Sequence, residues 1–140
     1  MKRIIKYLNP KDILLLHSLV VDATNDYHGI SDFHEFELAA MSPYSTFVGQ
    51  EMYPSIIEKA SALLQALLTR PVFVNKEKKA AVNEKTAIIA CITFLELNGY
   101  QFNASQTEIT QFILKSKREK LTVDEAIEWL QSNSFATVRH

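Results

Sequence analysis

The stretch that decides the fold runs from Thr69 to Tyr100 and reads TRPVFVNKEKKAAVNEKTAIIACITFLELNGY. Its first half is polar and cationic, and its second half is the most apolar segment of the chain. From Ala87 to Leu97 only Thr93 and Glu96 are polar, so a helix here is apolar on nearly every side. Such a helix must be enclosed by other elements. The sequence therefore predicts a central buried helix over about Asn83 to Asn98.

Residues at both ends of this stretch fit a helix. Asn98-Gly99 suits the C-terminus, because glycine adopts the left-handed conformation without a Cβ clash. At the start, Asn83 can cap the first backbone N–H groups. The partial positive charge of a helix N-terminus also favours an anion there.

Length and composition indicate one domain, residues 1–140. The chain has 140 residues, 47% of them hydrophobic, which is enough for one buried core. The net charge of −1 gives no general attraction to nucleic acid or to an anionic membrane. The single cysteine, Cys91, suits a reducing compartment, and no apolar run reaches the ~18 residues of a membrane span. Since the first residues do not form a signal peptide either, we expect a cytoplasmic protein.

Apolar spacing and capping signals predict further helices around the central one, and so an all-α bundle of about six helices. The predicted helices are Pro10–Thr24, Ser31–Met41, Ser55–Thr69, and two that begin at the capping boxes Ser105–Glu108 and Thr122–Glu125. Residues 1–8 read as an arm and residues 133–140 as a frayed tail. A small hairpin is expected between Tyr44 and Met52, where β-branched and aromatic residues replace the helical pattern.

One core should unite the apolar stripes. Its predicted members are Leu63, Leu64, Ile88, Ile92, Leu95 and Trp129. His17 lies on the apolar face of the first helix and is expected to be a buried structural histidine.

Several separate stretches resemble one known family in their order and spacing. They are Asp12-Ile13-Leu14-Leu15-Leu16-His17 after Tyr7-Leu8, Gly29-Ile30-Ser31-Asp32, Thr46-Phe47-Val48-Gly49-Gln50-Glu51-Met52-Tyr53-Pro54, and Phe94-Leu95-Glu96-Leu97-Asn98-Gly99-Tyr100. Together they resemble the Doc (death-on-curing) branch of the Fic superfamily over about residues 7–130. The resemblance implies a helical bundle with a hairpin flap.

The family's signature reads His-Pro-Phe-x-Asp-Gly-Asn-Lys-Arg-Thr at the start of the central helix. The resemblance implies a histidine base, an acidic residue for the metal, a glycine and helix N-terminus for phosphate, and basic residues for nucleotide charge. ATP and Mg²⁺ would be the cofactors of an active member, which transfers a phosphoryl or AMP group to a protein hydroxyl. Here Asn83-Glu84-Lys85-Thr86 keeps the asparagine and the threonine, and Glu-Lys replaces Lys-Arg.

Upstream of Asn83 the signature is lost. An ungapped alignment puts Glu77 at the histidine, Ala81 at the acidic residue and Val82 at the glycine. A gapped alignment instead makes Arg70-Pro71 the remnant of His-Pro. Neither alignment supplies a histidine, and a glutamate with an unperturbed pKa of about 4.3 is a poor base near neutral pH.

A local cationic excess remains. Between positions 70 and 85, five basic residues stand against two acidic ones. The residues proposed to contact a nucleotide or other anion are Asn83, Lys85, Lys79 and Arg70, with Glu77 as the base if transfer survives. The alternative interpretation is a solvated loop. No cluster of histidine, cysteine and carboxylate has metal-ligand spacing.

Three functions are compatible with these patterns. The first is a Doc-like toxin homologue that has lost catalysis and binds a partner, such as a small antitoxin. The second is an active transferase with a rebuilt loop. The third is a host- or phage-directed interaction module on the helical scaffold. The sequence favours the first over the second, because a base, a metal ligand and a phosphate-loop glycine are absent together.

Overall fold

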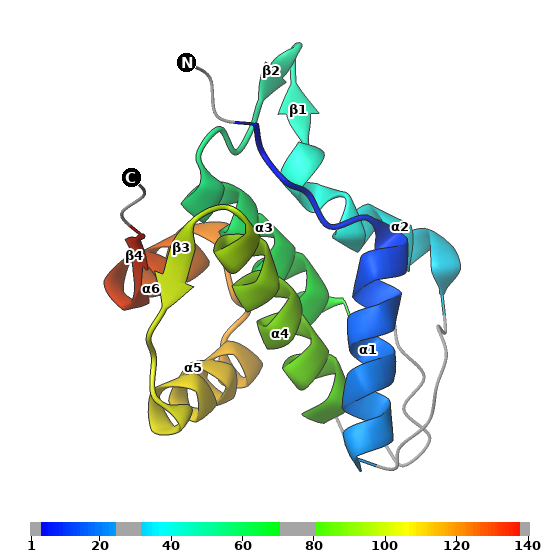
Figure 1. Ribbon diagram of the computed structural model, residues 1–140, viewed down its shortest axis with the longest axis vertical. Coiled ribbons are helices and arrows are strands. Elements are labelled where there is room, and N and C mark those ends of the chain that lie inside the picture. The colour runs from blue at the N-terminus through cyan, green and yellow to red at the C-terminus, as the bar shows by residue number, and fades with distance from the viewer. Residues whose placement is uncertain (1–3, 25–31, 71–80, 138–140) are drawn as a thin grey trace.

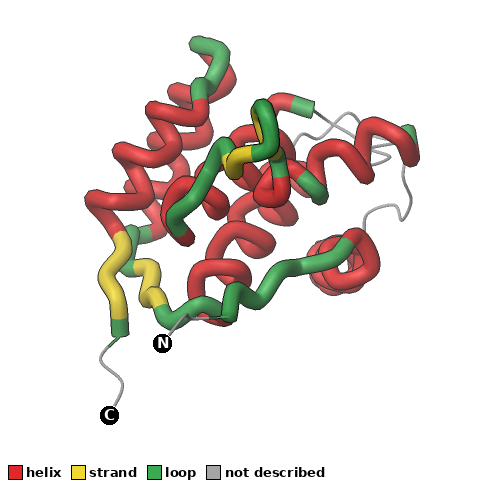
Figure 2. The backbone as a smooth tube through the Cα atoms, turned by 90° about the horizontal axis from the view of Figure 1, so that it is seen from above, coloured by secondary structure: helices red, strands yellow, loops and turns green. Residues whose placement is uncertain are grey.

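The computed structural model describes residues 4–24, 32–70 and 81–137. Six α-helices make up most of this described part, and two short pairs of strands accompany them (Figures 1 and 2). The helices are α1 (Pro10–Thr24), α2 (Phe33–Ala40), α3 (Ile56–Thr69), α4 (Ala81–Leu97), α5 (Gln106–Arg118) and α6 (Val123–Asn133). A 3₁₀ turn, η1 (Ser42–Tyr44), follows α2. The predicted all-α bundle of about six helices with a small hairpin is confirmed.

The centre of the fold is the pair of α3 and α4, which pack along each other (Figure 1). On its other sides α4 contacts α1 and the strand that follows it, and α6 packs on α3. The helix α4 is buried along most of its length because alanine, cysteine and large apolar residues occupy nearly every position from Ala87 to Leu97. The predicted central helix is therefore correct, although it begins two residues earlier than expected.

Most of the predicted core is confirmed. Leu63, Leu64, Ile88 and Leu95 are buried in one cluster, whereas Ile92 and Trp129 are partly buried and pack against it. The two exceptions lie on the side of the core that faces α5. Because α5 has no fully buried residue of its own, it covers this side only partially.

Capping side chains begin the helices as the sequence predicted, with one correction. Reciprocal capping boxes are present at Ser105 and Thr122, and a third one, not anticipated, starts α3 at Ser55. The predicted cap of α2 is wrong: Asp32, not Ser31, accepts the hydrogen bond from the backbone N–H of Glu35. An aspartate carboxylate is a stronger acceptor than a serine hydroxyl and also complements the helix dipole.

The predicted hairpin between Tyr44 and Met52 is confirmed. Its strands, β1 (Thr46–Phe47) and β2 (Gln50–Glu51), pair antiparallel through a two-residue turn. Val48 and Gly49 both have positive φ, 52° and 75°, as expected for a tight hairpin turn that matches the twist of its strands. All four strand residues are exposed, and the hairpin projects from the helices at the top of Figure 1.

A second pair of strands was missed, and the expected frayed tail is wrong over these residues. The strand β3 (Tyr100–Phe102) pairs antiparallel with β4 (Ser134–Ala136). Further backbone hydrogen bonds join Asn103 to Asn133 and Thr137 to Gly99, both at 2.7 Å. Residues 134–137 are held in place by this pairing, because their backbone hydrogen bonds join them to the distant segment that follows α4.

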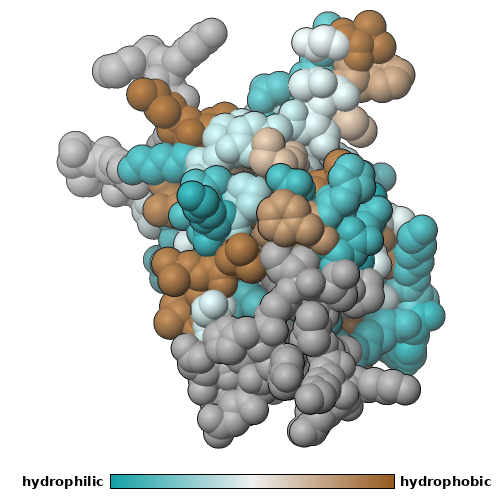
Figure 3. All heavy atoms as spheres, turned by 90° about the vertical axis from the view of Figure 1, so that its right-hand side faces the viewer, coloured by the Kyte–Doolittle hydropathy of each residue, from teal (hydrophilic) through white to brown (hydrophobic). Residues whose placement is uncertain are grey.

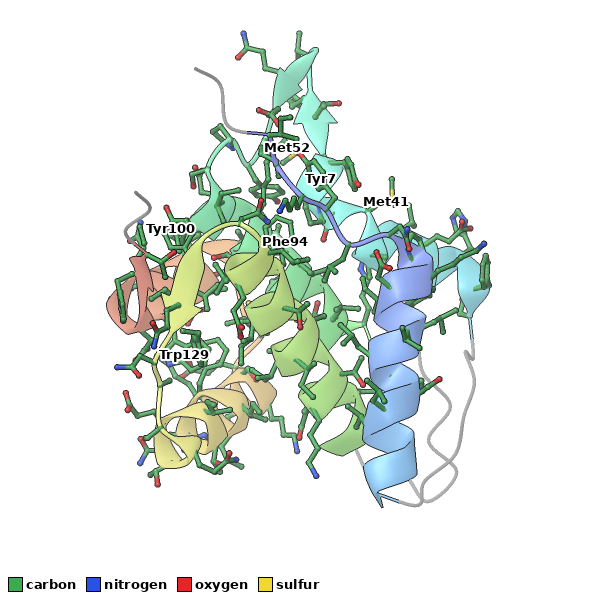
Figure 4. The ribbon with its side chains drawn as sticks, viewed as in Figure 1. Tyr7, Met41, Met52, Phe94, Tyr100 and Trp129 are labelled. Carbon is green, nitrogen blue, oxygen red and sulfur yellow. The ribbon has the colours of Figure 1, made fainter. Side chains whose placement is uncertain are left out.

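The N-terminal arm is anchored to the C-terminal end of α4. The side chain of Asn98 accepts a hydrogen bond from the Lys6 backbone N–H and donates one to the Lys6 carbonyl, both at 2.8 Å. Further along the arm, Tyr7 lies over this end of the helix near Phe94 (Figure 4). Asn98 therefore both ends the helix and holds the arm.

Within the described part of the chain, no helix combines the length and the apolar character that crossing a membrane requires.

The structure predicts an unreactive thiol at Cys91. This side chain is fully buried in α4, and burial raises its pKa far above the ordinary value. Because only the thiolate is nucleophilic, alkylation at pH 8 should be at least ~100-fold slower in the native protein than in urea. A thiol-reactive dye followed by absorbance measures both rates. Rapid labelling of the folded chain would contradict the burial of α4.

Candidate functional site at the start of the central helix

The sequence placed the candidate site at the start of α4, and the structure describes part of it. Asn83, Lys85 and Arg70 lie within the described residues, whereas Glu77 and Lys79 lie outside them. The two alignments with the family signature differ in a segment outside the described residues, so the ungapped and the gapped alignment both stay predictions.

Asn83 is buried in the first turn of α4. It is 9% exposed, and its Oδ1 atom has no hydrogen-bond partner. A buried acceptor without a donor costs about 1–3 kcal/mol, so this is an unfavourable place for an amide in the free chain. In this orientation, the Oδ1 atom would accept a hydrogen bond from a hydroxyl group or a water molecule. Rotation of the amide would present its N–H groups instead, which is what an anion requires.

Thr86, the other residue kept from the family signature, faces the interior between α1 and α4. Its Oγ1 atom lies 3.2 Å from Nδ1 of His17, and both side chains are buried. The predicted structural role of His17 is confirmed by this burial. The pair joins two helices through a polar contact inside an apolar core, so it fixes how the start of α4 sits against α1.

Glu84 points to a different neighbour, helix α5. Its carboxylate forms an ion pair with Lys117 at 2.7 Å, and its side chain is mostly buried. The sequence had identified Glu84 as a negative charge at a position where the family has a cation. In the fold, Lys117 offsets that charge locally, so repulsion of phosphate by Glu84 is weaker than the sequence suggests.

The two described cationic candidates lie in different surroundings. Arg70 follows α3 and pairs with Glu35 of α2 at 3.5 Å, with both side chains about half exposed. Such a surface pair contributes little, ~0–1 kcal/mol. Lys85 is exposed and lies beside the groove between α4 and α5. The contacts described for the two cations are therefore with different helices, α2 for Arg70 and the α4–α5 groove for Lys85.

That groove has a volume of about 480 Å³ and an apolar floor. Its lining residues are Glu84, Lys85, Ile88, Ile89, Ile92, Gln106, Ile109, Thr110, Ile113, Leu114 and Lys117. The Glu84–Lys117 pair bridges the two helices on the side where α4 begins. A second hollow of about 530 Å³ lies between α5 and α6, over the stacked rings of Phe112 and Trp129.

The described residues do not fit a magnesium centre. Among them, no three histidine, cysteine, aspartate or glutamate side chains lie close enough together to hold a metal ion. The carboxylate in the first turn of α4, that of Glu84, is already paired with Lys117. For phosphate, the described residues provide the helix start, the Asn83 amide and the Lys85 ammonium.

Sequence reasoning missed two polar contacts, and one of them had a readable signal. No local pattern relates Lys117 to Glu84. The contact missed in α3 is that of Lys59, whose side chain is fully buried. Its position, three residues after Ile56 and four before Leu63, places it on the apolar stripe of that helix. A charged residue at a stripe position indicates a buried ion pair.

Comparison with known proteins agrees with the resemblance in the sequence. No family model matches the chain. The protein named Toxin Doc from Mycolicibacterium smegmatis is 32% identical to it over 99 residues, which are 71% of this chain and 69% of that protein. The helical architecture with a small hairpin agrees with this relationship. The chain therefore belongs to the Doc branch of the Fic/Doc superfamily.

Proposed function

We propose that this chain is a toxin homologue of the Doc type that has lost transfer chemistry and acts by binding a protein partner. The observation that carries the proposal is the absence of a histidine from the segment that precedes α4, where the family signature has its base. The four histidines of the chain are His17, His28, His34 and His140, so the segment from position 70 to α4 has none. His17, which does lie at α4, is 1% exposed and contacts Thr86. Because His17 is buried, its imidazole cannot reach the hydroxyl group of a target protein.

The partner is expected to be a small antitoxin. The relative's name, Toxin Doc, describes a toxin, and the family resemblance implies a companion antitoxin. The chain also has apolar side chains that a partner would cover. On α1 and at the hairpin tip these are Leu15, Leu19, Phe47 and Val48, all well exposed. Figure 3 shows apolar atoms gathered at the tip of the projecting hairpin. Exposed apolar groups of this kind are typical of interaction surfaces.

Incubation of the chain with labelled ATP, Mg²⁺ and a cell extract should give no transfer of phosphate or AMP above background. The physical reason is the joint loss of base, metal ligand and phosphate-loop glycine, each of which positions or stabilises charge in phosphoryl transfer. Restoring a histidine alone, in Glu77→His, should not rescue transfer. Gel autoradiography measures the label, and an active protein kinase in the same extract serves as the positive control.

The opposite result would identify a working enzyme. Time-dependent labelling of a protein by the unmodified chain, abolished in Glu77→Ala, would overturn the proposal and make Glu77 the base. The same pair of proteins separates the two mechanisms in cells. If the chain arrests growth by binding, Glu77→Ala should arrest growth equally; if it acts by transfer, Glu77→Ala should be harmless.

Weak triphosphate binding should survive the loss of chemistry. The start of α4 retains its backbone dipole and Lys85, and Lys117 offsets the charge of Glu84. Because these contacts are electrostatic and partly exposed, the affinity should fall as salt rises. Titration of a fluorescent ATP analogue at low and high salt measures this. Affinity that does not change with salt would exclude an electrostatic site, and Lys85→Met should weaken binding if the site is correct.

A further inference from the structure

Lys59 is a buried cation outside the site described above. Its side chain is 0% exposed, and it lies near the N-terminal end of α3. The ammonium lies 2.8 Å from Oε1 of Glu51 in β2 and 3.4 Å from the carbonyl oxygen of Pro43 in η1. It also lies 5.7 Å from the ring centroid of Tyr7 in the N-terminal arm. We call Lys59, Glu51, Pro43 and Tyr7 the Lys59 cluster.

The Lys59 cluster joins four parts of the chain at one charge. The ring of Tyr7 also stacks on Tyr44 of η1, with centroids 4.0 Å apart, so the arm and the 3₁₀ turn meet beside the ammonium. Figure 4 shows Tyr7 reaching from the arm into this region below the hairpin. A charge-assisted hydrogen bond and a cation–π contact both act on one ammonium here.

A buried lysine is not needed to fill this space. Taking an ammonium out of water costs several kcal/mol, and its partners offset that cost only when their geometry is good. Replacing a buried charge by an apolar side chain of similar volume commonly leaves the stability of the folded protein equally high. The lysine therefore contributes something that methionine or leucine cannot, namely a directional contact with a carboxylate on another element.

That other element is the hairpin, which has little else to hold it. Its strand residues are exposed, and the hydrogen bond from the Met52 N–H to the Ser45 carbonyl lies within the hairpin itself. In the described part of the chain, the Lys59–Glu51 pair is the side-chain hydrogen bond that ties the hairpin to a helix. Without it, no side-chain hydrogen bond among the described residues would join the hairpin to a helix.

We infer that Lys59 is the positioning residue of the hairpin: its buried ammonium holds Glu51, and this fixes the direction in which Phe47 and Val48 point. The contact surface of the tip is thus set from the core of the protein. This inference concerns the free chain and holds whether or not the chain transfers phosphate or binds an antitoxin. Its test needs no partner, so the two proposals fail separately.

The test is limited digestion of the native full-length chain with chymotrypsin, with each cut site quantified by mass spectrometry. Phe47 is 72% exposed at the hairpin tip, and Phe135 in β4, 50% exposed, reports on a distant site. In Lys59→Met, cleavage after Phe47 should rise about tenfold, the factor expected from losing one charge-assisted hydrogen bond. Cleavage after Phe135 and the Tm should stay unchanged, because methionine fills the same space.

Two further variants complete the test. Glu51→Ala removes the other partner and should raise cleavage after Phe47 to a similar extent. The double variant should show no further rise, since both changes remove the same contact. The matched control is Lys85→Met, which removes an exposed lysine from α4 and should leave cleavage after Phe47 unaltered.

Unchanged cleavage after Phe47 in a folded Lys59→Met protein would overturn the inference. If Lys59→Met is cut at every site and so fails to fold, Glu51→Ala decides instead. In that case, cleavage after Phe47 at the rate of the unmodified chain would show that the pair does not position the hairpin. Equal increases at Phe47 and Phe135 would assign Lys59 a general structural role and would also overturn it.

Discussion

Replacing Leu95 with alanine should lower the free energy of unfolding by about 2 to 5 kcal/mol. Leu95 is 0% exposed on α4 and belongs to the main apolar cluster. Alanine removes apolar contacts and leaves a cavity that the close packing of α3 against α4 cannot readily close. Urea titration followed by far-UV circular dichroism measures the change.

A matched control lies two residues further along the same helix. Leu97 is 40% exposed, so Leu97→Ala should change the free energy of unfolding by only ~0.5 kcal/mol or less. The two variants share chemistry and helix propensity and differ in burial. A loss below ~1 kcal/mol for Leu95→Ala, or equal losses for both, would mean that α4 is not the centre of the core.

Trp129→Ala should cost about 3 kcal/mol, at the lower end of the range for removing a large aromatic residue, because Trp129 is only partly buried. Its ring stacks on Phe112 of α5 at 3.9 Å between centroids and lies 5.3 Å from Phe102 of β3. Since α5 has no fully buried residue, these ring contacts form much of its attachment. The loss should therefore be concentrated in α5.

Amide hydrogen exchange distinguishes this expectation from a general loss of stability. In Trp129→Ala, amides of α5 should exchange faster than in the unmodified chain by a larger factor than those of α3 and α4. Phe135→Ala, which removes a half-exposed aromatic residue from the neighbouring strand β4, is the control and should alter α5 little. Uniform acceleration in all three helices would show that Trp129 supports the whole core instead.

The sequence by itself determined the helices and most of the core. Four adjacent residues are enough to specify the start of a helix, as in Ser105–Glu108 and Thr122–Glu125. Both capping boxes form as predicted. The apolar run of α4 likewise predicts its own burial, because no orientation of such a helix exposes a polar face. The hairpin turn at Val48-Gly49 is a local signal of the same kind.

Local signals did not reveal the pairing of β3 with β4. Three-residue strands have no periodicity to recognise, and the segment after Asn133 is polar enough to resemble a frayed end. The strand exists because the end of α6 lies next to the end of β3, where free backbone groups meet. That proximity is a result of how α6 packs on α3, and adjacent residues do not encode it.

The candidate site likewise has features that the sequence predicts and contacts that only the tertiary structure determines. From the sequence, Asn83 and Thr86 could be assigned to the first turn of a helix, and the loss of the histidine could be read directly. Only the tertiary structure decided that Thr86 meets His17, that Glu84 pairs with Lys117, and that Lys59 holds Glu51. Each of these contacts joins side chains from different elements, so its formation depends on helix packing, which a charge pattern along one chain does not specify.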